Sequence, residues 1–140
     1  MSKTTIELYI ALFESLTPET VKQFEPLVTE NIRFADPFND VRGYTKMRDI
    51  MLDMFERSES PKFSVYEWVK NENTVFIRWK FEATLPVLGL FQTDGVSRVS
   101  LDESGLVSEH VDFWDSAPLY MQIPILGRLL RSIRAKMALP

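Results

Sequence analysis

Cysteine is missing from this 140-residue sequence, and histidine occurs only once. The missing cysteine excludes disulfides, thiolate metal sites and a cysteine nucleophile. A single histidine among scattered carboxylates does not form a metal-ligand set, so we expect no metal. Glycine is scarce, and the five glycines form neither a phosphate-binding loop nor a Gly-x-Ser-x-Gly nucleophile turn. We therefore also expect no cofactor.

Long apolar runs are missing as well. No stretch approaches the length of a membrane span, and residues Met1 to Thr4 show no signal-peptide pattern, so we expect a cytoplasmic protein. The net charge is −4, from 16 basic and 20 acidic residues. From Ser116 onward there are four basic residues and no acid, so the remainder carries −8 (12 basic against 20 acidic). An acidic body argues against general nucleic-acid binding.

The residues that are present are typical of a globular protein. Apolar residues make up 45% of the chain and aromatic residues 12%. The length fits one domain over residues 1–140. So many rings suit a curved sheet wrapped on helices, and they also suit an aromatic cavity.

Helical patterns dominate the first half of the sequence. Thr4 and Glu7 fit a capping box at the start of the first helix. A second helix is predicted to start at Thr17-Pro18, with Pro26 distorting its end. After a loop over Phe38–Gly43, a third helix presents an apolar face. The three apolar faces comprise Ile6, Tyr9, Ile10, Phe13 and Leu16; Val21, Phe24, Leu27 and Val28; and Tyr44, Met47, Ile50, Met51, Met54 and Phe55.

Strands dominate the second half. Residues alternate between apolar and charged along Thr74–Leu85, which places Trp79 on the inward face. Helices that cluster early and strands that cluster late predict an α+β fold. The predicted strands are Ile32–Asp36, Phe63–Lys70, Thr74–Leu85, Phe91–Leu101 and Leu106–Asp115.

Three segments carry a resemblance to a known superfamily. Phe34–Phe38, followed by Gly43 and a helix, resembles the segment around the catalytic aspartate of ketosteroid isomerases. Tyr9–Phe13 resembles the segment that holds their oxyanion-binding tyrosine, and Glu109–Asp115 resembles the closing strand of SnoaL-like proteins. The chain is therefore similar to the nuclear transport factor 2-like superfamily. That resemblance implies a cone-shaped, strongly bent mixed sheet wrapping three N-terminal helices, with an added C-terminal helix, and it implies a homodimer.

Asp36 and Tyr9 are candidate catalytic residues by this resemblance. Pro37 holds Asp36 extended, which can aim its carboxylate into an aromatic cavity as a base. The alternative is that Asp36 caps the turn at Pro37. Tyr9 would donate a hydrogen bond to a developing oxyanion, or it is simply a core tyrosine.

The closing strand supplies the other candidates. His110, Asp112 and Trp114 alternate and so share one face, about 6.5–7 Å apart in pairs. Asp112 could orient the imidazole, and His110 could face Asp36 as an acid–base pair. The alternative is a histidine at the edge of the core. Ser97 stands where the isomerases carry a second acid, and Arg98 points outward by parity. The predicted ligand-binding residues are Trp114, Trp79, Phe38, Ser97 and Phe13.

The C-terminal segment is amphipathic and basic. Five apolar residues from Leu126 to Met137 form a stripe, and Arg128, Arg131, Arg134 and Lys136 lie off it. We favour a helix that covers the mouth of the cone or packs on a dimer partner. The alternative is a helix that lies on a membrane surface.

Two functions remain open at this point. The first is binding of a small apolar molecule with cofactor-free acid–base conversion, such as isomerisation, cyclisation or hydration. The second is a non-catalytic module that binds a ligand or a protein partner, with membrane contact through the C-terminal helix as one possibility.

Overall fold

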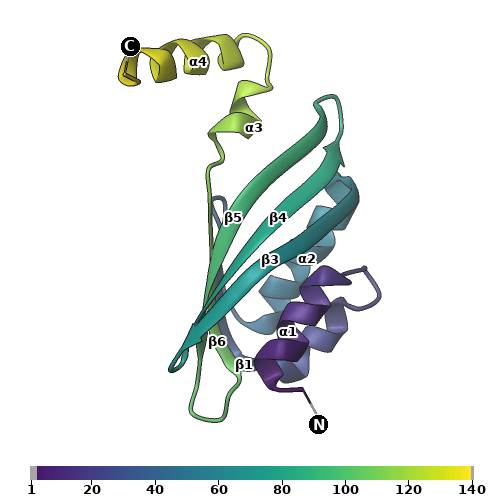
Figure 1. Cartoon of the computed structure of the whole chain (residues 1–140). Helices are drawn as coiled ribbons and strands as arrows, with labels where there is room; N and C mark the ends of the chain where they lie inside the picture. The colour runs from purple at the N-terminus through teal and green to yellow at the C-terminus, as the bar shows by residue number, and fades with distance from the viewer. Residues whose placement is uncertain (1–2, 140) are drawn as a thin grey trace.

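The computed structural model describes residues 3–139, and its body is a mixed α+β domain built on one curved, unclosed sheet. The strand order is β2-β1-β6-β5-β4-β3, and all neighbours are antiparallel except β1 and β6. Figure 1 shows the sheet bending around α1 and α2. The strands are β1 (Val28–Ala35), β2 (Asp40–Arg42), β3 (Glu59–Asn71), β4 (Thr74–Leu85), β5 (Gly89–Leu101) and β6 (Val107–Trp114). The predicted fold class is confirmed.

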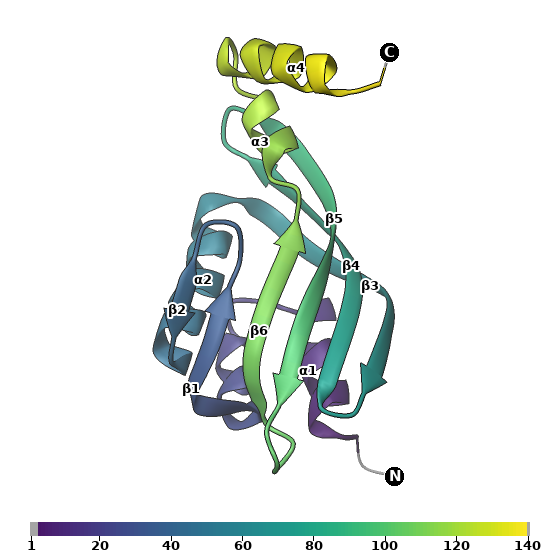
Figure 2. The same cartoon turned by 90° about the vertical axis from the view of Figure 1, so that its left-hand side faces the viewer.

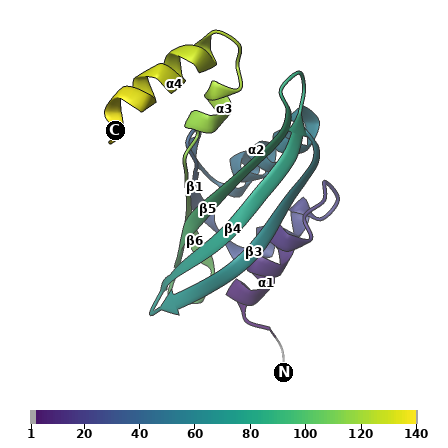
Figure 3. The same ribbon diagram turned by 45° about the horizontal axis from the view of Figure 1, so that its top comes forward.

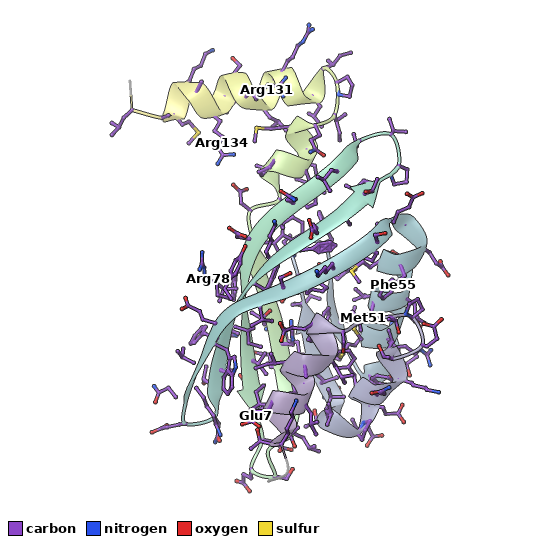
Figure 4. All side chains as sticks on the ribbon, turned by 45° about the vertical axis from the view of Figure 1, so that its right-hand side comes forward. Glu7, Met51, Phe55, Arg78, Arg131 and Arg134 are labelled. Carbon is purple, nitrogen blue, oxygen red and sulfur yellow. The ribbon has the colours of Figure 1, made fainter. Side chains whose placement is uncertain are left out.

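The concave side of the sheet holds three helical segments, α1 (Thr5–Glu14), η1 (Val21–Leu27) and α2 (Tyr44–Arg57). The predicted capping box is present, because Thr4 and Glu7 each accept a hydrogen bond from the other's backbone N–H. Met51 lies on the side of α2 that faces the sheet, and it is buried there (Figure 4). The core therefore lies between these helices and the inward face of the strands.

The prediction of a second α-helix from Thr17 is wrong. Residues from Thr17 form a turn followed by the seven-residue 3-10 helix η1. Pro26 lies inside this segment and lacks the N–H that an α-helix would use. Val28, the last residue of the predicted apolar stripe, already belongs to β1. The stripe still packs inward, since Val21 and Phe24 are fully buried.

The segment Phe38–Gly43, expected to be a loop, contains the short edge strand β2. Its residue Asp40 pairs with Arg33 of β1 through two nitrogen–oxygen contacts of 3.0 Å each. This pair lowers the pKa of Asp40 through the hydrogen bonds from Arg33. Three residues are too few for an alternation pattern, which is why the strand was not predicted.

Alternation along β4 places side chains as expected. Val75, Ile77 and Trp79 are buried on the concave face. Arg78 projects from the convex face, on the side away from α1 and α2 (Figure 4). The convex face of the sheet also exposes Phe76 and Phe113, whose side chains are 44% and 54% accessible.

The chain ends in two helices, α3 (Ala117–Met121) and α4 (Leu126–Met137). Asp115 accepts a hydrogen bond from the backbone N–H of Ala117, the first residue of α3. α3 leans over the end of the sheet, whereas α4 projects beyond it (Figures 2 and 3). The helix from Leu126 does not cover the mouth of the cone, because the main contacts of α4 are with α3. The alternative expectation, that this helix packs on a dimer partner, stays a prediction.

Among residues 3–139, no helix is long and apolar enough to cross a membrane.

Candidate functional site

A cavity of about 260 Å³ opens between the concave face of the sheet and α2. Its volume lies just below the range of roughly 300–1,000 Å³ that is usual for sites of drug-sized ligands. Most of its wall is aromatic or aliphatic, and the polar groups on it are few. Its apolar lining includes Phe13, Phe34, Phe63, Trp79, Phe81, Phe91 and Trp114. The cavity therefore suits a small apolar molecule.

A chain of hydrogen bonds joins five side chains, of which Trp79 and Asp112 lie on the wall of this cavity. The Trp79 indole Nε1–H donates to Ser97 Oγ at 2.8 Å, and Ser97 Oγ–H donates to Asp112 Oδ1 at 2.5 Å. On the other side, Asp112 Oδ1 lies 2.7 Å from His110 Nε2, and His110 Nδ1 lies 2.8 Å from the Tyr9 hydroxyl. The chain links α1 to three neighbouring strands.

When Asp112 is a carboxylate, the donors on both sides of it are all oriented toward Asp112. A carboxylate only accepts, so His110 Nε2 carries the proton that it donates to Oδ1. Burial, together with the charge of Asp112, raises the pKa of Tyr9 well above its usual range, so the phenol keeps its proton at neutral pH. Tyr9 can then donate to Nδ1 of a neutral imidazole. Every donor in the network thus leads toward Asp112.

Asp112 is the ionisable member of the network that reaches the main cavity, which Trp79 also lines. Tyr9 and His110 are 0% and 2% accessible, and neither lines the 260 Å³ cavity. The Asp112 side chain is 15% accessible and does line it. The two bonds to this carboxylate both end on Oδ1, and no hydrogen bond from residues 3–139 reaches Oδ2. Asp112 therefore offers a carboxylate oxygen to a ligand, with the rest of the network behind it.

Behind the main cavity lies an inner space of about 20 Å³, lined in part by Ser97, His110 and Asp112. This volume is enough for one water molecule, which needs roughly 10–15 Å³. Phe34 stacks on the His110 ring at a centroid distance of 4.8 Å, and Phe13 packs at 5.4 Å. The imidazole is thus held by aromatic packing as well as by its two hydrogen bonds.

Asp36 lies on the wall of the same cavity but is held in a turn. Its Oδ1 accepts hydrogen bonds from the backbone N–H groups of Phe38 and Asn39, each at 2.8 Å. The Asn39 side-chain amide reaches both carboxylate oxygens, at 3.2 and 3.3 Å. The structure does not bring Asp36 and His110 together as a pair, because both imidazole nitrogens bind Tyr9 and Asp112.

An aromatic group frames the mouth of the cavity. Phe38 meets Trp114 edge to face at a centroid distance of 5.6 Å and meets Tyr120 of α3 at 6.4 Å. Phe91 packs on Trp114 from the other side at 6.0 Å. Leu119 of α3 lies on the cavity wall. The helix α3 thus covers part of the mouth, whereas α4, the helix that was expected there, contributes no residue to the cavity wall.

Gly95 is a site residue that the sequence analysis missed. A Cβ placed on Gly95 would lie 2.4 Å from the Trp79 ring, which crosses it on the neighbouring strand. Only glycine therefore lets Trp79 lie flat at the cavity floor with its N–H on Ser97. The alternating pattern of β5 could have identified the position as inward-facing, but not the close approach. Phe63 and Phe91 were missed too, although both lie on strands that were predicted.

Among residues 3–139, no group of three or more His, Cys, Asp or Glu side chains is arranged to hold a metal ion.

The fold and this cavity together define a class of small α+β proteins in which a bent sheet encloses a ligand pocket. The sequence profile of the SnoaL-like domain matches residues 9–110, well over half of the chain. The protein belongs to the SnoaL-like domain family. No protein with a curated description matches the sequence.

Solved structures with the same fold share little sequence with this chain. A nuclear transport factor 2-like protein of unknown function from Exiguobacterium sp. 255-15 superposes with a TM-score of 0.69 at 20% identity, covering 80% of this chain and 98% of its own. A SnoaL-like polyketide cyclase from Agrobacterium tumefaciens C58 gives 0.70 at 18% identity, covering 86% and 98%.

A third protein, from Catenulispora acidiphila, has a ketosteroid isomerase-like fold and was solved in complex with trimethylamine. It gives a TM-score of 0.71 at 9% identity, covering 87% of this chain and 93% of its own. At these identities the likeness establishes the fold.

Proposed function

We propose that the cavity binds a small apolar carbonyl compound and that Asp112 moves a proton on it. The observation that carries the proposal is the position of Asp112, with Oδ1 bound by Ser97 and His110 and Oδ2 left for a ligand in a mostly apolar cavity. A positioned carboxylate of this kind acts as a general base. The SnoaL-like cyclase among the structural neighbours is compatible with such chemistry.

In the proposed reaction, Asp112 Oδ2 accepts a proton from the carbon next to the carbonyl group and returns it to the same or another carbon. Isomerisation and cyclisation both need this step and consume no proton overall. His110 and Ser97 hold the carboxylate in place through their hydrogen bonds to Oδ1. Tyr9 acts behind His110, so it is a positioning residue and does not bind the oxyanion itself. This arrangement reverses the initial expectation that Asp112 serves only to orient His110.

The test begins with binding. Trp79 and Trp114 line the cavity, so a ligand should change tryptophan fluorescence, and Trp68→Phe removes the one tryptophan that does not line it. A panel of small cyclic ketones and enones is screened in this way. Compounds that bind are then incubated in D₂O with the protein, and exchange of the α-proton is followed by NMR.

Asp112→Asn and Asp36→Asn form a matched pair of variants. Both residues line the cavity and both substitutions remove one charge. Asparagine at position 36 still offers an oxygen to cap the turn. We expect Asp112→Asn to slow exchange about 100-fold or more, and Asp36→Asn to leave it within a few-fold. The reverse result would assign the base to Asp36 and refute the role of Asp112.

A second function, binding without conversion, is favoured by one specific observation. The polar groups of Tyr9, His110, Ser97 and Trp79 all have partners within the protein, as a structural network would. In that case ligands bind, yet no α-proton exchange above the rate in buffer is seen with any bound carbonyl compound.

We also propose a homodimer that forms through the convex face of the sheet. Phe76 and Phe113 are exposed there beside Arg78 and Arg98, which leaves aromatic surface for a second copy to cover. Sedimentation velocity at micromolar concentration should give the dimer mass, and Phe113→Glu should give the monomer. A wild-type protein with the monomer mass would refute this proposal.

A further inference from the structure

α4 is attached to the rest of the molecule by one side. Gly127 packs so closely on α3 that a Cβ there would lie 2.1 Å from the carbonyl oxygen of Met121. Arg131 Nη1 donates to the same carbonyl at 2.7 Å, and Arg134 Nη2 lies 3.2 Å from Asp115 Oδ2. Figure 4 labels both arginines on this helix. The side of α4 that faces the protein therefore carries these polar contacts together with the half-buried Leu130.

The other side of α4 is apolar and exposed. Its large side chains recur three and four residues apart, which places them on one face of the helix. Leu129, Ile133 and Met137 are 58%, 47% and 84% accessible, and Leu126 is 41% accessible. Apart from the half-buried Leu130, the apolar stripe of α4 is thus left uncovered by its own domain, unlike that of a helix packed on a protein core.

Two strained turns expose further apolar residues at the same end of the molecule. Val87, at the β4–β5 turn, and Ile125, between α3 and α4, have positive φ angles of 68° and 72°. Each is the centre of a γ-turn that follows a proline, with N–H to carbonyl bonds of 2.7 Å for Leu88 to Pro86 and 2.8 Å for Leu126 to Pro124. Such turns are rare, and a β-branched residue there is strained.

Both side chains lie in solvent, since Val87 is 102% and Ile125 is 82% accessible. The two turns are neighbours, because Leu88 lines the same surface hollow as Ile125 and Arg128. Figures 1 and 2 show the β4–β5 turn beside α3. Two segments far apart in the sequence thus offer apolar side chains at one end of the protein. We call Val87, Ile125 and the apolar stripe of α4 the apolar end.

The charges around the apolar end indicate what covers it. Four basic residues and no acidic residue occur from Ser116 onward, while the rest of the chain carries −8. Arg128 and Lys136 are exposed on α4 and make no ion pair within residues 3–139. Apolar side chains on one face with cations beside them match an anionic lipid surface, into which such a helix inserts about 5–10 Å.

We propose that the apolar end docks on an anionic phospholipid membrane, with α4 lying in the interface and Val87 and Ile125 entering the acyl boundary. α3 connects this end to the cavity, because Leu119 lies on the cavity wall. Docking would place the cavity mouth near the lipid, where apolar molecules concentrate. The proposal does not depend on the chemistry assigned to Asp112.

Vesicle flotation with the full-length protein tests the proposal. The vesicles are phosphatidylcholine alone and an equal mixture of phosphatidylcholine and phosphatidylglycerol. We expect binding to the mixed vesicles that weakens as salt is added, and little binding to phosphatidylcholine alone. Absence of binding to the mixed vesicles at low salt, or equal binding to both, would overturn the proposal.

Two adjacent positions on α4 provide a matched pair of variants. Ile133→Glu and Ser132→Glu add the same charge to exposed residues, but only the first removes an apolar side chain from the stripe. We expect Ile133→Glu to weaken vesicle binding at least about tenfold more than Ser132→Glu. A double change of Arg128 and Lys136 to Gln should reduce the dependence on salt without loosening α4, which Arg131 and Arg134 hold.

A second copy of the chain is the competing occupant of the stripe. If Ile133→Glu converts an oligomer to a monomer while vesicle binding is unchanged, then the stripe packs on protein and the proposal is wrong. Circular dichroism of each variant confirms that the body remains folded. Ligand binding in the cavity, measured without vesicles, should be the same in all of them.

Discussion

The body of the molecule, up to and including α3, buries many of its large apolar side chains in a core, whereas the C-terminal arm, α4, exposes most of its own. In the body, Tyr9, Phe24 and Val75 are fully buried. In the arm, Leu129, Ile133 and Met137 are exposed on a helix that contacts little besides α3. The body is stabilised by its own core, whereas the arm has a surface that only another molecule can cover. The comparison teaches that the core and the proposed membrane contact are located in different parts of the chain, and variants in each part can separate them.

The largest effect is expected from a core residue at the cavity floor. Trp79→Ala removes a large buried ring and its hydrogen bond to Ser97. We expect the free energy of unfolding to fall by about 3–5 kcal/mol, as measured by denaturant titration. Trp68→Ala is the control, because Trp68 is 38% accessible and outside the cavity. Equal losses from the two variants would mean that the inward face of β4 does not carry the core.

A smaller effect is expected from Tyr9→Phe, which removes one hydroxyl from the buried network. His110 Nδ1 then lacks its partner, which should cost about 1–3 kcal/mol, or a fall in melting temperature of roughly 3–10 °C. Fluorescence-monitored melts at neutral pH measure this loss. A melting temperature unchanged by the substitution would mean that the network is not formed in solution.

The same variant has a pH signature that simple loss of packing would not produce. Burial raises the pKa of Tyr9, so above the pKa of an unfolded tyrosine, about 10, the folded state retains a proton that the unfolded state loses. Stability from this residue is therefore fully present below pH 10 and is lost as the pH rises further. We expect the wild-type melting temperature to fall more steeply than that of Tyr9→Phe above pH 10. If the melting temperatures of the two proteins fell in parallel with pH, Tyr9 would not be a buried, protonated phenol.

Local sequence patterns predicted most of the body. Strand β4 begins and ends where alternation indicated, because its inward residues must all reach one core. Helix α1 begins at its capping box for an equally local reason. The 3-10 helix η1 was not predicted, since hydrophobic spacing cannot distinguish a short α-helix from a tighter one that ends at a strand.

The candidate site was predicted as a set of residues but not as a network. Parity placed His110, Asp112 and Trp114 on one face, and these residues do lie on the concave side. The bond between Ser97 and Asp112 depends on the register of β5 against β6, which contains an irregularity near Ser100 and cannot be obtained from one sequence. For Asp36, a position before a proline fits both a base and a turn cap, and the resemblance favoured the base. The structure places Asp36 on the cavity wall, with its carboxylate capping the turn.

The smallest effect is expected from removing α4, and it tests the contrast between body and arm most directly. A chain that ends after Gln122 keeps α3, so Leu119 still lines the cavity and Tyr120 still meets Phe38. The losses are two exposed arginine contacts, to Met121 and Asp115, each worth well under about 1 kcal/mol. Little apolar surface of the body is uncovered, because α4 contacts mainly α3 and Leu130 is its one half-buried large apolar residue. We therefore expect the melting temperature to change by no more than about 2–3 °C, and binding to anionic vesicles to be lost. A much larger fall would show that α4 packs on the body or on a second copy in solution, and the body and arm would then be one cooperative unit.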